Sequence, residues 1–202
     1  MSGKSYHKIY KTGFSNKVMI WILWLLIILI ALLVVMFIFY YNRFVVLDNR
    51  IDNSLAQIDV QLKRRADLVP NLINTVKGYA KHEKGIMTAV TEARKALLGA
   101  KDLKGRMKAG NQLQEALKSI FAIAENYPQL KANENFLHMQ QELAAIEDKI
   151  AYSRQFYTDS ILVYNNSVEV FPGALFAKIF GKKEKLQFTI PAEEKAVPKV
   201  QF

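Results

Sequence analysis

The chain has 202 residues, of which 51% are hydrophobic and 23% are charged, so it is long enough for one domain with short appendages. It contains no cysteine, which excludes disulfide bonds, thiolate metal sites and cysteine nucleophiles. The formal net charge is +10, but basic residues are interleaved with acidic ones, so we expect no nucleic-acid partner; the modest excess instead favours anionic lipid headgroups or acidic proteins.

The N-terminal region combines a basic tail with a long apolar stretch. Residues 1–17 carry Lys4, Lys8, Lys11 and Lys17 and no acidic residue, and residues 18–41 read VMIWILWLLIILIALLVVMFIFYY, without charge, proline or glycine. As a helix this stretch is roughly 36 Å long, enough to cross a hydrocarbon core of about 30 Å. It is apolar on every face, unlike a core helix, and too long for the apolar region of a signal peptide. We therefore predict an uncleaved transmembrane helix.

Aromatic residues and flanking charges suggest how this helix is placed. Trp21 and Trp24 lie near one end and Tyr40 and Tyr41 at the other, so we predict all four as membrane-interface anchors. Few basic residues follow the stretch, whereas the short tail is rich in lysine. The positive-inside rule then places the N-terminus in the cytoplasm. We expect a single-pass protein of the cell (inner) membrane whose C-terminal domain is periplasmic or extracellular.

An apolar stripe with helical spacing follows the membrane segment directly. Its members are three or four residues apart: Phe44, Leu47, Ile51, Leu55, Ile58, Leu62, Ala66, Val69, Ile73, Val76 and Ala80. Pro70 lies within the stripe without changing its phase, although proline normally disrupts a helix. We expect either one continuous helix kinked near Val69 or two coaxial helices, with Pro70 as the hinge.

Three further helices are predicted at about residues 86–98, 106–125 and 134–169 from the same periodicity. Residues 99–105 (GAKDLKG) are expected to form a turn. Asn126, Tyr127 and Pro128 are expected to form a structural turn, because proline disfavours helical geometry in the residue before it. Asn133 is the predicted N-cap of the last long helix.

The C-terminal region is predicted to be a short helix followed by a tail. Residues 174–181 (ALFAKIFG) form a short apolar helix that either packs on the bundle or rests on the membrane surface, with Lys178 and Lys182 near the headgroups. Residues 182–202 are expected to be mostly disordered. The segment LQFTI, at residues 186–190, is the one part of this tail that we expect to dock as a strand.

Because each stripe needs another to cover it, the predicted fold class is all-α. The N-terminal transmembrane helix is followed, at residues 42–181, by an elongated antiparallel bundle of about four helices with long coiled-coil-like members. The same spacing permits self-association into a homo-oligomer.

No pattern in the sequence points to catalysis, a cofactor or a metal. The histidines, His7, His82 and His138, are isolated from one another, and no glycine-rich phosphate loop or nucleophile elbow is present. We therefore predict no catalytic, cofactor-binding or metal-binding residues, and we expect a protein that is not an enzyme.

The most charged segment is the one around Pro70, and two interpretations remain open. In the first, it is a solvated face in which Asp59, Lys63 and Asp67 form pairs four residues apart. In the second, it is a docking surface, because solubility alone requires neither a proline within the stripe nor three consecutive basic residues, and Pro70 and Asn71 lower helix propensity. The candidate interaction surface comprises Asp59, Lys63, Arg64, Arg65, Asp67, Asn71, His82 and Glu83.

Several strings resemble the successive signatures of the bacterial LemA family. They are IDVQLKRRADLVPNLINTVKGYAKHE, VTEARKA, AENYPQLKANENFLHMQQEL, IEDKIAYSRQFYTDSILVYN and FPGALFAKIFG, in the order of the family. The resemblance implies one N-terminal membrane helix followed by an antiparallel helical bundle, and it implies no catalytic residue.

These observations predict a function in binding. We expect a membrane-anchored adaptor or scaffold of the bacterial envelope, with the lipid bilayer and an unidentified protein as its partners. The alternative is an accessory subunit or sensor that regulates a neighbouring membrane protease or transporter through the kink at Pro70.

Overall fold

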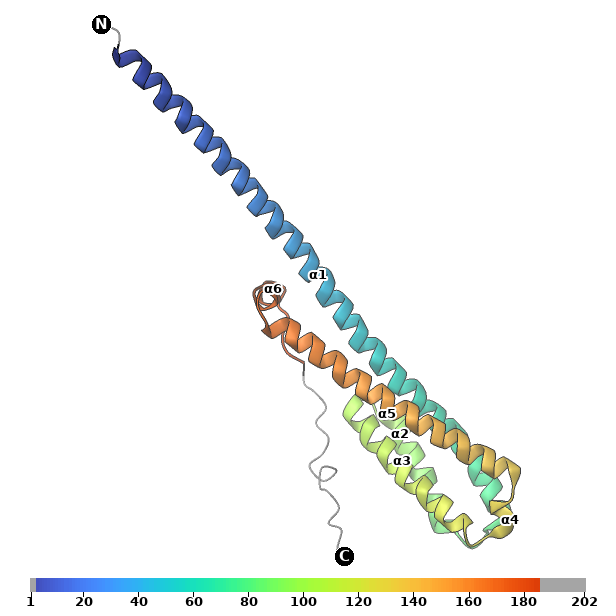
Figure 1. The fold of residues 1–202 in the computed structure, drawn as a ribbon. Coiled ribbons are helices and arrows are strands. Elements are labelled where there is room, and N and C mark those ends of the chain that lie inside the picture. The colour runs from blue at the N-terminus through green and yellow to red at the C-terminus, as the bar shows by residue number, and fades with distance from the viewer. Residues whose placement is uncertain (1–2, 186–202) are drawn as a thin grey trace, which may run out of the picture. The chain divides into compact units, whose positions relative to one another are not determined.

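The computed structural model describes residues 3–185, with side chains from residue 17 onward. Six helices occupy this part of the chain: α1 (Gly3–Tyr79), α2 (Lys84–Gly99), α3 (Leu103–Ala124), α4 (Pro128–Lys131), α5 (Glu134–Glu169) and α6 (Gly173–Ile179), as Figure 1 shows. No strand occurs among these residues, so the all-α fold class is confirmed. The strand predicted at residues 186–190, and all of the predicted tail beyond residue 185, lie outside the described residues.

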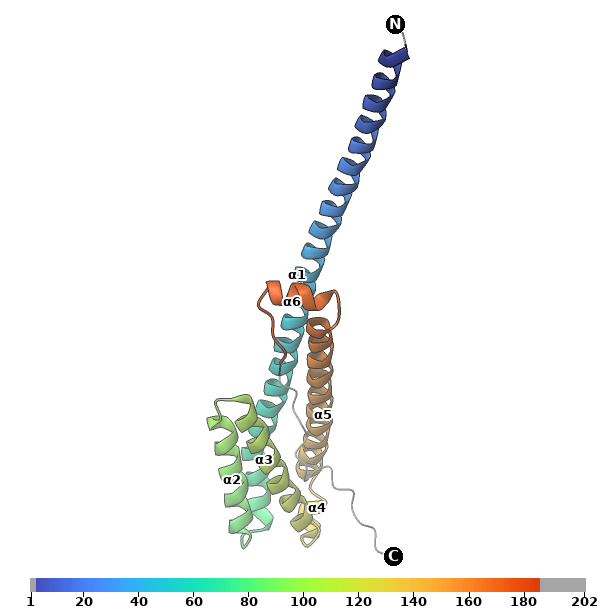
Figure 2. The same cartoon turned by 90° about the vertical axis from the view of Figure 1, so that its left-hand side faces the viewer.

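The described chain divides into two compact units, and both α1 and α5 contribute to each. The bundle unit comprises residues 50–161, and the aromatic unit comprises the chain up to residue 49 together with residues 162–185. Within the bundle unit, α1, α2, α3 and α5 run side by side in alternating directions (Figures 1 and 2). This arrangement is the antiparallel bundle of about four helices that the periodicity predicts.

The N-terminal part of α1 contains one candidate membrane span. It is long and apolar enough to cross a bilayer, and none of its most apolar window is buried inside the chain. A helix that is apolar all round and has no protein cover is suited to lipid rather than to water. The same helix then continues without interruption into the bundle unit.

The predicted apolar stripe of α1 forms part of the core. Ten of its eleven members are buried and Leu55 is half-buried, so the helical period correctly identified the inward face. Ser54 is also buried on this side. Its hydroxyl donates to the carbonyl of Ile51 at 2.6 Å, which satisfies the polar group inside the core.

The boundaries of α3 follow from local capping chemistry. The carboxylate of Asp102 accepts a hydrogen bond from the amide of Gly105 at 3.2 Å, so the helix begins at Leu103, earlier than the spacing predicts. It ends at Ala124, and Pro128 then opens α4 at a position where the missing amide proton is not needed. The periodicity did not predict α4, because four residues are too few to show a period.

The last long helix has the bounds that the sequence predicts, Glu134–Glu169. The side-chain oxygen of Asn133 accepts from the amide of Phe136 at 3.0 Å, so Asn133 is the N-cap that the sequence indicated.

Rings from α1, α5 and α6 form the core of the aromatic unit. Tyr40 stacks on Phe176 with 4.9 Å between ring centroids, and Phe44 contacts Tyr164 and Phe180 at 6.3 and 6.1 Å. Edge-to-face and stacked arrangements of this kind stabilise aromatic clusters beyond the area that they bury. One face of α6 therefore packs on the rest of this unit, as in the first of the two predicted arrangements, and its other face is exposed.

Candidate functional site

The basic run at residues 63–65 divides between the surface and the core. Lys63 and Arg64 are exposed, whereas Arg65 is only 2% exposed. Arg65 lies three residues after Leu62 and four before Val69, so it has the same helical phase as the buried stripe. Its assignment to the exposed interaction surface was wrong, and this phase was the signal that could have corrected it.

Buried Arg65 connects α1 to two other helices. Its guanidinium forms an ion pair with Glu147 on α5, and its Nη1 donates to the carbonyl of Gly110 on α3 at 3.4 Å. Burial, with a smaller contribution from Arg154, lowers the pKa of Arg65 to about 10, so the group stays positively charged at neutral pH. A buried charge is tolerated only when it is paired and hydrogen-bonded, and both conditions are met here.

Gly110 allows α3 to come close to α1 at this point. A Cβ atom on Gly110 would lie 2.8 Å from Cδ2 of Leu62, closer than carbon atoms normally approach. On the neighbouring residue, Asn111 accepts a hydrogen bond from Arg154 of α5 at 2.8 Å. Arginines thus link the buried faces of α1, α3 and α5 through polar contacts.

Asp59 also pairs with another helix rather than along its own. Its Oδ2 lies 2.6 Å from Nη1 of Arg106 on α3. Lys63 and Asp67 form no ion pair with any residue from 17 to 185, so the pairs predicted along α1 do not form. Asp59 pairs with Arg106 instead of with Lys63, because α1 and α3 hold Asp59 and Arg106 close together.

The contact between Arg94 and α1 explains how the helix continues through Pro70. Pro70 has no amide proton, so the carbonyl of Ala66, one turn earlier, loses its usual helical donor. Nε of Arg94, on α2, donates to that carbonyl at 2.7 Å. The structure has one continuous helix rather than two coaxial ones, and the kink near Val69 stays a prediction. The role of Arg94 was not predicted, although this residue lies within the string VTEARKA.

Four of the eight residues predicted for the interaction surface lie on one exposed strip of α1. Lys63, Arg64, Asp67 and Asn71 are all exposed, and Val60, one turn before Arg64, is 56% exposed. We call these five residues the α1 face. Among the described residues its three charges have no ionic partner, so the face presents polar groups that a second molecule can contact.

His82 and Glu83 lie outside this strip, in the turn between α1 and α2. They follow Lys63 by about 20 residues, or roughly 30 Å of helix, so the eight predicted residues do not form one surface. The phenolic hydroxyl of Tyr127 donates to Oε1 of Glu83 at 3.4 Å. Glu83 therefore serves local packing at the end of the bundle unit.

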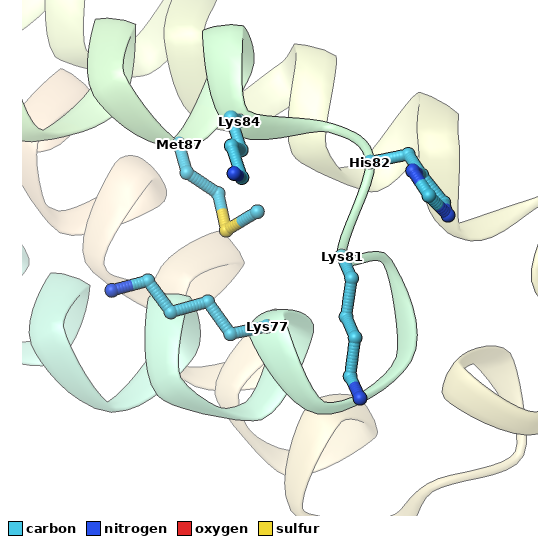
Figure 3. A pocket seen from close by; sticks show the side chains of 5 residues that line it. All are labelled: Lys77, Lys81, His82, Lys84 and Met87. Atoms are coloured by element: carbon cyan, nitrogen blue, oxygen red, sulfur yellow. The ribbon is translucent and has the colours of Figure 1, made fainter.

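An open depression of about 460 Å³ lies beside this turn. It is lined by Lys77, Lys81, His82, Lys84 and Met87. Figure 3 shows that Lys81 and His82 point away from Lys77 and Met87, so the basic groups do not converge on one point. The depression is basic but lacks the convergent polar groups of a ligand pocket.

The predicted turn at residues 126–128 is held by the backbone. The amides of Asn126 and Tyr127 donate to the carbonyls of Ile123 and Ala124 at 2.8 and 3.1 Å. Pro128 is exposed and begins α4.

The four predicted interface anchors do not share one environment. Trp21, Trp24 and Tyr41 expose more than half of their surface, as anchors in lipid would. Tyr40 is half-buried because it stacks on Phe176 of α6. Tyr40 therefore has a packing role within the aromatic unit.

A second ionic cluster closes the aromatic unit. Nζ of Lys182 and Nζ of Lys185 each lie 2.7 Å from a carboxylate oxygen of Asp48. Burial alone would raise the pKa of Asp48, but the hydrogen bonds and charges of the two lysines outweigh it, so this pKa lies below its ordinary value. The side chain of Asn165 also accepts from the amide of Lys185, at 2.9 Å, which fixes this segment on α5.

The described side chains contain no group of three or more His, Asp or Glu residues arranged to hold a metal ion. Between helices of the bundle unit, the polar contacts described above are ion pairs and hydrogen bonds donated by arginine side chains. The α1 face presents a fixed pattern of charged and hydrogen-bonding groups, and this is the chemistry that it offers to a partner.

Comparisons with known proteins identify related chains. The family model described as the LemA family matches residues 54–202. The chain is similar to Magnetosome protein MamQ of Magnetospirillum gryphiswaldense, with 26% identity over 169 residues, which cover 71% of this chain and 62% of that protein. It is similar to Magnetosome protein MamQ 2 of Paramagnetospirillum magneticum, with 25% identity over 174 residues, covering 73% and 64%. It is also similar to Protein LemA of Metamycoplasma hominis, with 23% identity over 124 residues, covering 61% and 57%.

The chain thus spans less than two thirds of the length of each of these relatives. The family model, in contrast, covers most of this chain. The resemblance seen in the sequence is confirmed, and the chain belongs to the LemA family.

Proposed function

We propose that the chain is a membrane-anchored adaptor whose bundle unit binds another protein through the α1 face. The candidate membrane span supports membrane association, as does similarity to magnetosome proteins. The observation that carries the proposal is the set of three charges, Lys63, Arg64 and Asp67, that are exposed without ionic partners among the described residues.

The buried side of the same helical turns supports a binding role. Asp59, Arg65 and the Ala66 carbonyl each contact another helix, which fixes the rotation of α1. A surface on a rigid helix loses little conformational entropy when it binds, so a modest number of contacts gives useful affinity. The anchor adds to this effect, because confinement to one membrane raises the effective concentration of a partner in that membrane.

A site-specific photo-crosslinking experiment tests the proposal. A photoreactive residue at position 63, in the full-length chain in its native membrane, should give a discrete heavier adduct. The same residue at Lys95, an exposed lysine on α2, serves as the matched control. Asp67→Lys should abolish the adduct from position 63, because it reverses one charge of the α1 face. Equal adducts from positions 63 and 95, or an adduct that Asp67→Lys leaves unchanged, would contradict the proposal.

We further propose that the adaptor acts without catalysing a reaction. The described residues bring together ion pairs between helices rather than a nucleophile and a base. Turnover of a substrate by the purified full-length protein, abolished by a substitution in the bundle unit, would overturn this part of the proposal.

For its location, we propose the cell (inner) membrane, with a cytoplasmic N-terminus. The lysines of the short tail support this orientation through the positive-inside rule. Protease added to cells with a permeabilised outer layer should then degrade the bundle unit while the inner membrane is intact. If the bundle unit is protected from protease until the inner membrane is broken, the orientation is the reverse of the one proposed.

A second candidate function is regulation of a neighbouring membrane protease or transporter. The observation that favours it is the hydrogen bond from Arg94 to the Ala66 carbonyl, which lacks its helical donor because of Pro70. This hydrogen bond couples the position of α2 to the geometry of α1. Pro70→Ala separates the two functions. A passive adaptor should keep its crosslinked adduct and its effect on the partner, whereas a regulator should keep the adduct and lose the effect.

A further inference from the structure

The outer face of α6 and the turn before it form an apolar patch. Val170, Phe171, Leu175 and Ile179 are between 55% and 76% exposed. We call these four residues the α6 patch. Single exposed apolar side chains are ordinary, but a cluster of four large ones on a helix and its adjoining turn marks an interaction surface.

The buried face of α6 fixes the level at which this patch lies along α1. The ring of Phe180 contacts Phe37 and Tyr41, with centroids 4.9 and 5.6 Å apart. Phe176 stacks on Tyr40 at 4.9 Å. All three partners on α1 belong to the last turns of the apolar stretch at residues 18–41. The patch is therefore held where the candidate membrane span ends.

The direction of α6 also matches a membrane surface. Within the aromatic unit, α6 lies across α1 and at the end of α5 (Figures 1 and 2). When α1 crosses a bilayer, a helix lying across it runs along the membrane plane. This is the orientation of an interfacial amphipathic helix.

The distribution of charge separates an apolar side from a polar side of this unit. No acidic residue occurs between Glu169 and Glu184, and Lys178 is exposed within α6. Lys182 instead pairs with Asp48, which follows Tyr40 by about 12 Å of helix. Lys182 is therefore engaged with a carboxylate of α1, and its placement near headgroups stays a prediction. Lys178 and Lys183 are the exposed cations of this segment.

We propose that the α6 patch is inserted into the interfacial layer of the bilayer that α1 spans. Its occupant is lipid: the acyl chains just below the headgroups cover Phe171, Leu175 and Ile179. Three ring contacts join α6, which carries the patch, to the end of the candidate membrane span. The aromatic unit then has two attachments to the membrane, which fixes the direction in which α1 leaves it.

Depth-dependent quenching of tryptophan fluorescence tests this proposal. The full-length chain, with Trp21→Phe and Trp24→Phe, is placed as single copies in nanodiscs of phosphatidylcholine and phosphatidylglycerol. Leu175→Trp then reports on the patch, and Leu162→Trp is the matched control. Leu162 is an exposed leucine of the same unit, 47% exposed and about 12 Å before Val170 along α5. The quenchers are lipids brominated near the top or near the end of the acyl chain.

Insertion to about 5–10 Å predicts that lipids brominated near the top of the chain quench Leu175→Trp at least about twofold and quench Leu162→Trp only slightly. Ile179→Trp should behave like Leu175→Trp, and it provides a second reading if one variant fails to fold. Equal quenching at positions 175 and 162 would overturn the proposal. So would an unquenched position 175 that becomes shielded only in nanodiscs with two copies, because the occupant would then be a second chain.

Discussion

The two compact units of this chain hold their helices together by different chemistry. The aromatic unit uses rings: Tyr40 packs against Phe176, and Phe44 packs against both Tyr164 and Phe180. The bundle unit uses an aliphatic seam in which arginines reach from one helix to a carboxylate, an amide or a backbone carbonyl of another.

The difference follows from where each unit sits in the sequence. Rings with a polar edge suit the end of an apolar membrane stretch, because one side of the group is apolar and the other tolerates water. In the bundle unit, the close approach at Gly110 and the proline at position 70 leave backbone carbonyls that a long, forked side chain can reach. Rings therefore position α6, whereas arginines fix the rotation and register of the bundle.

The largest effect should come from removing the counterion of Arg65. Glu147→Ala leaves a buried guanidinium without its carboxylate and should lower the free energy of unfolding by about 3 kcal/mol. Arg65→Met removes the buried charge itself and should cost about 1 kcal/mol, because Glu147 is partly exposed and can be hydrated. Urea unfolding of the full-length protein in detergent, followed by circular dichroism, measures both.

Glu142→Ala, at an exposed position of the same helix, is the control and should change stability by less than about 0.5 kcal/mol. If Arg65→Met destabilises the protein more than Glu147→Ala, an unpaired charge at Arg65 is not the main cost, and the prediction is wrong.

The next effect concerns Pro70 and Arg94. Arg94→Met removes the donor to the Ala66 carbonyl and should cost about 1.5 kcal/mol. In a Pro70→Ala background the restored amide can donate to the same carbonyl, so Arg94→Met should cost about 1 kcal/mol less. A double-mutant cycle by urea unfolding measures this coupling, and additive losses would show that Arg94 does not substitute for the missing amide.

Two glycines should respond to alanine with opposite signs. Gly110→Ala gains helix propensity but pushes a Cβ into buried Leu62, and its net effect should be a loss of about 1 kcal/mol. Gly78→Ala, also within a helix, meets no atom within 4 Å and should gain about 0.5–1 kcal/mol. The thermal midpoints of the two variants provide the measurement. A stabilising Gly110→Ala would mean that α3 can move away from α1 at little cost.

The smallest effect should be local to the aromatic unit. Asp48→Asn should reduce hydrogen-exchange protection at residues 182–185, whereas Asp52→Asn, at an exposed position of α1, should not. Because the lysines depress the pKa of Asp48, the stabilisation is present above its ordinary pKa of 3.8 and disappears as the pH falls through the lower folded-state value.

The difference in exchange between wild type and Asp48→Asn should therefore be constant near neutral pH and disappear as the pH falls through the folded-state pKa of Asp48, which lies below 3.8. Exchange at residues 182–185 that is the same in both proteins at neutral pH would show that the ion pairs do not hold this segment.

The sequence by itself determined the all-α fold class, the positions of the long helices and the inward faces of these helices. Periodicity identified the buried side of α1, and Asn133 identified the start of α5, because both signals lie within one or two turns of a single helix. Exposure of Lys63, Arg64, Asp67 and Asn71 was also predictable, since these residues lie off the stripe.

Only the tertiary structure decided which charges are available to a partner. Arg65, Asp59 and the Ala66 carbonyl find their partners on other helices, at separations in sequence that no local pattern encodes. The same is true of α6, whose hidden and exposed faces depend on rings at positions 37–44. A helical period shows which side of a helix points inward, but the identity of the group that it meets depends on which helices pack together.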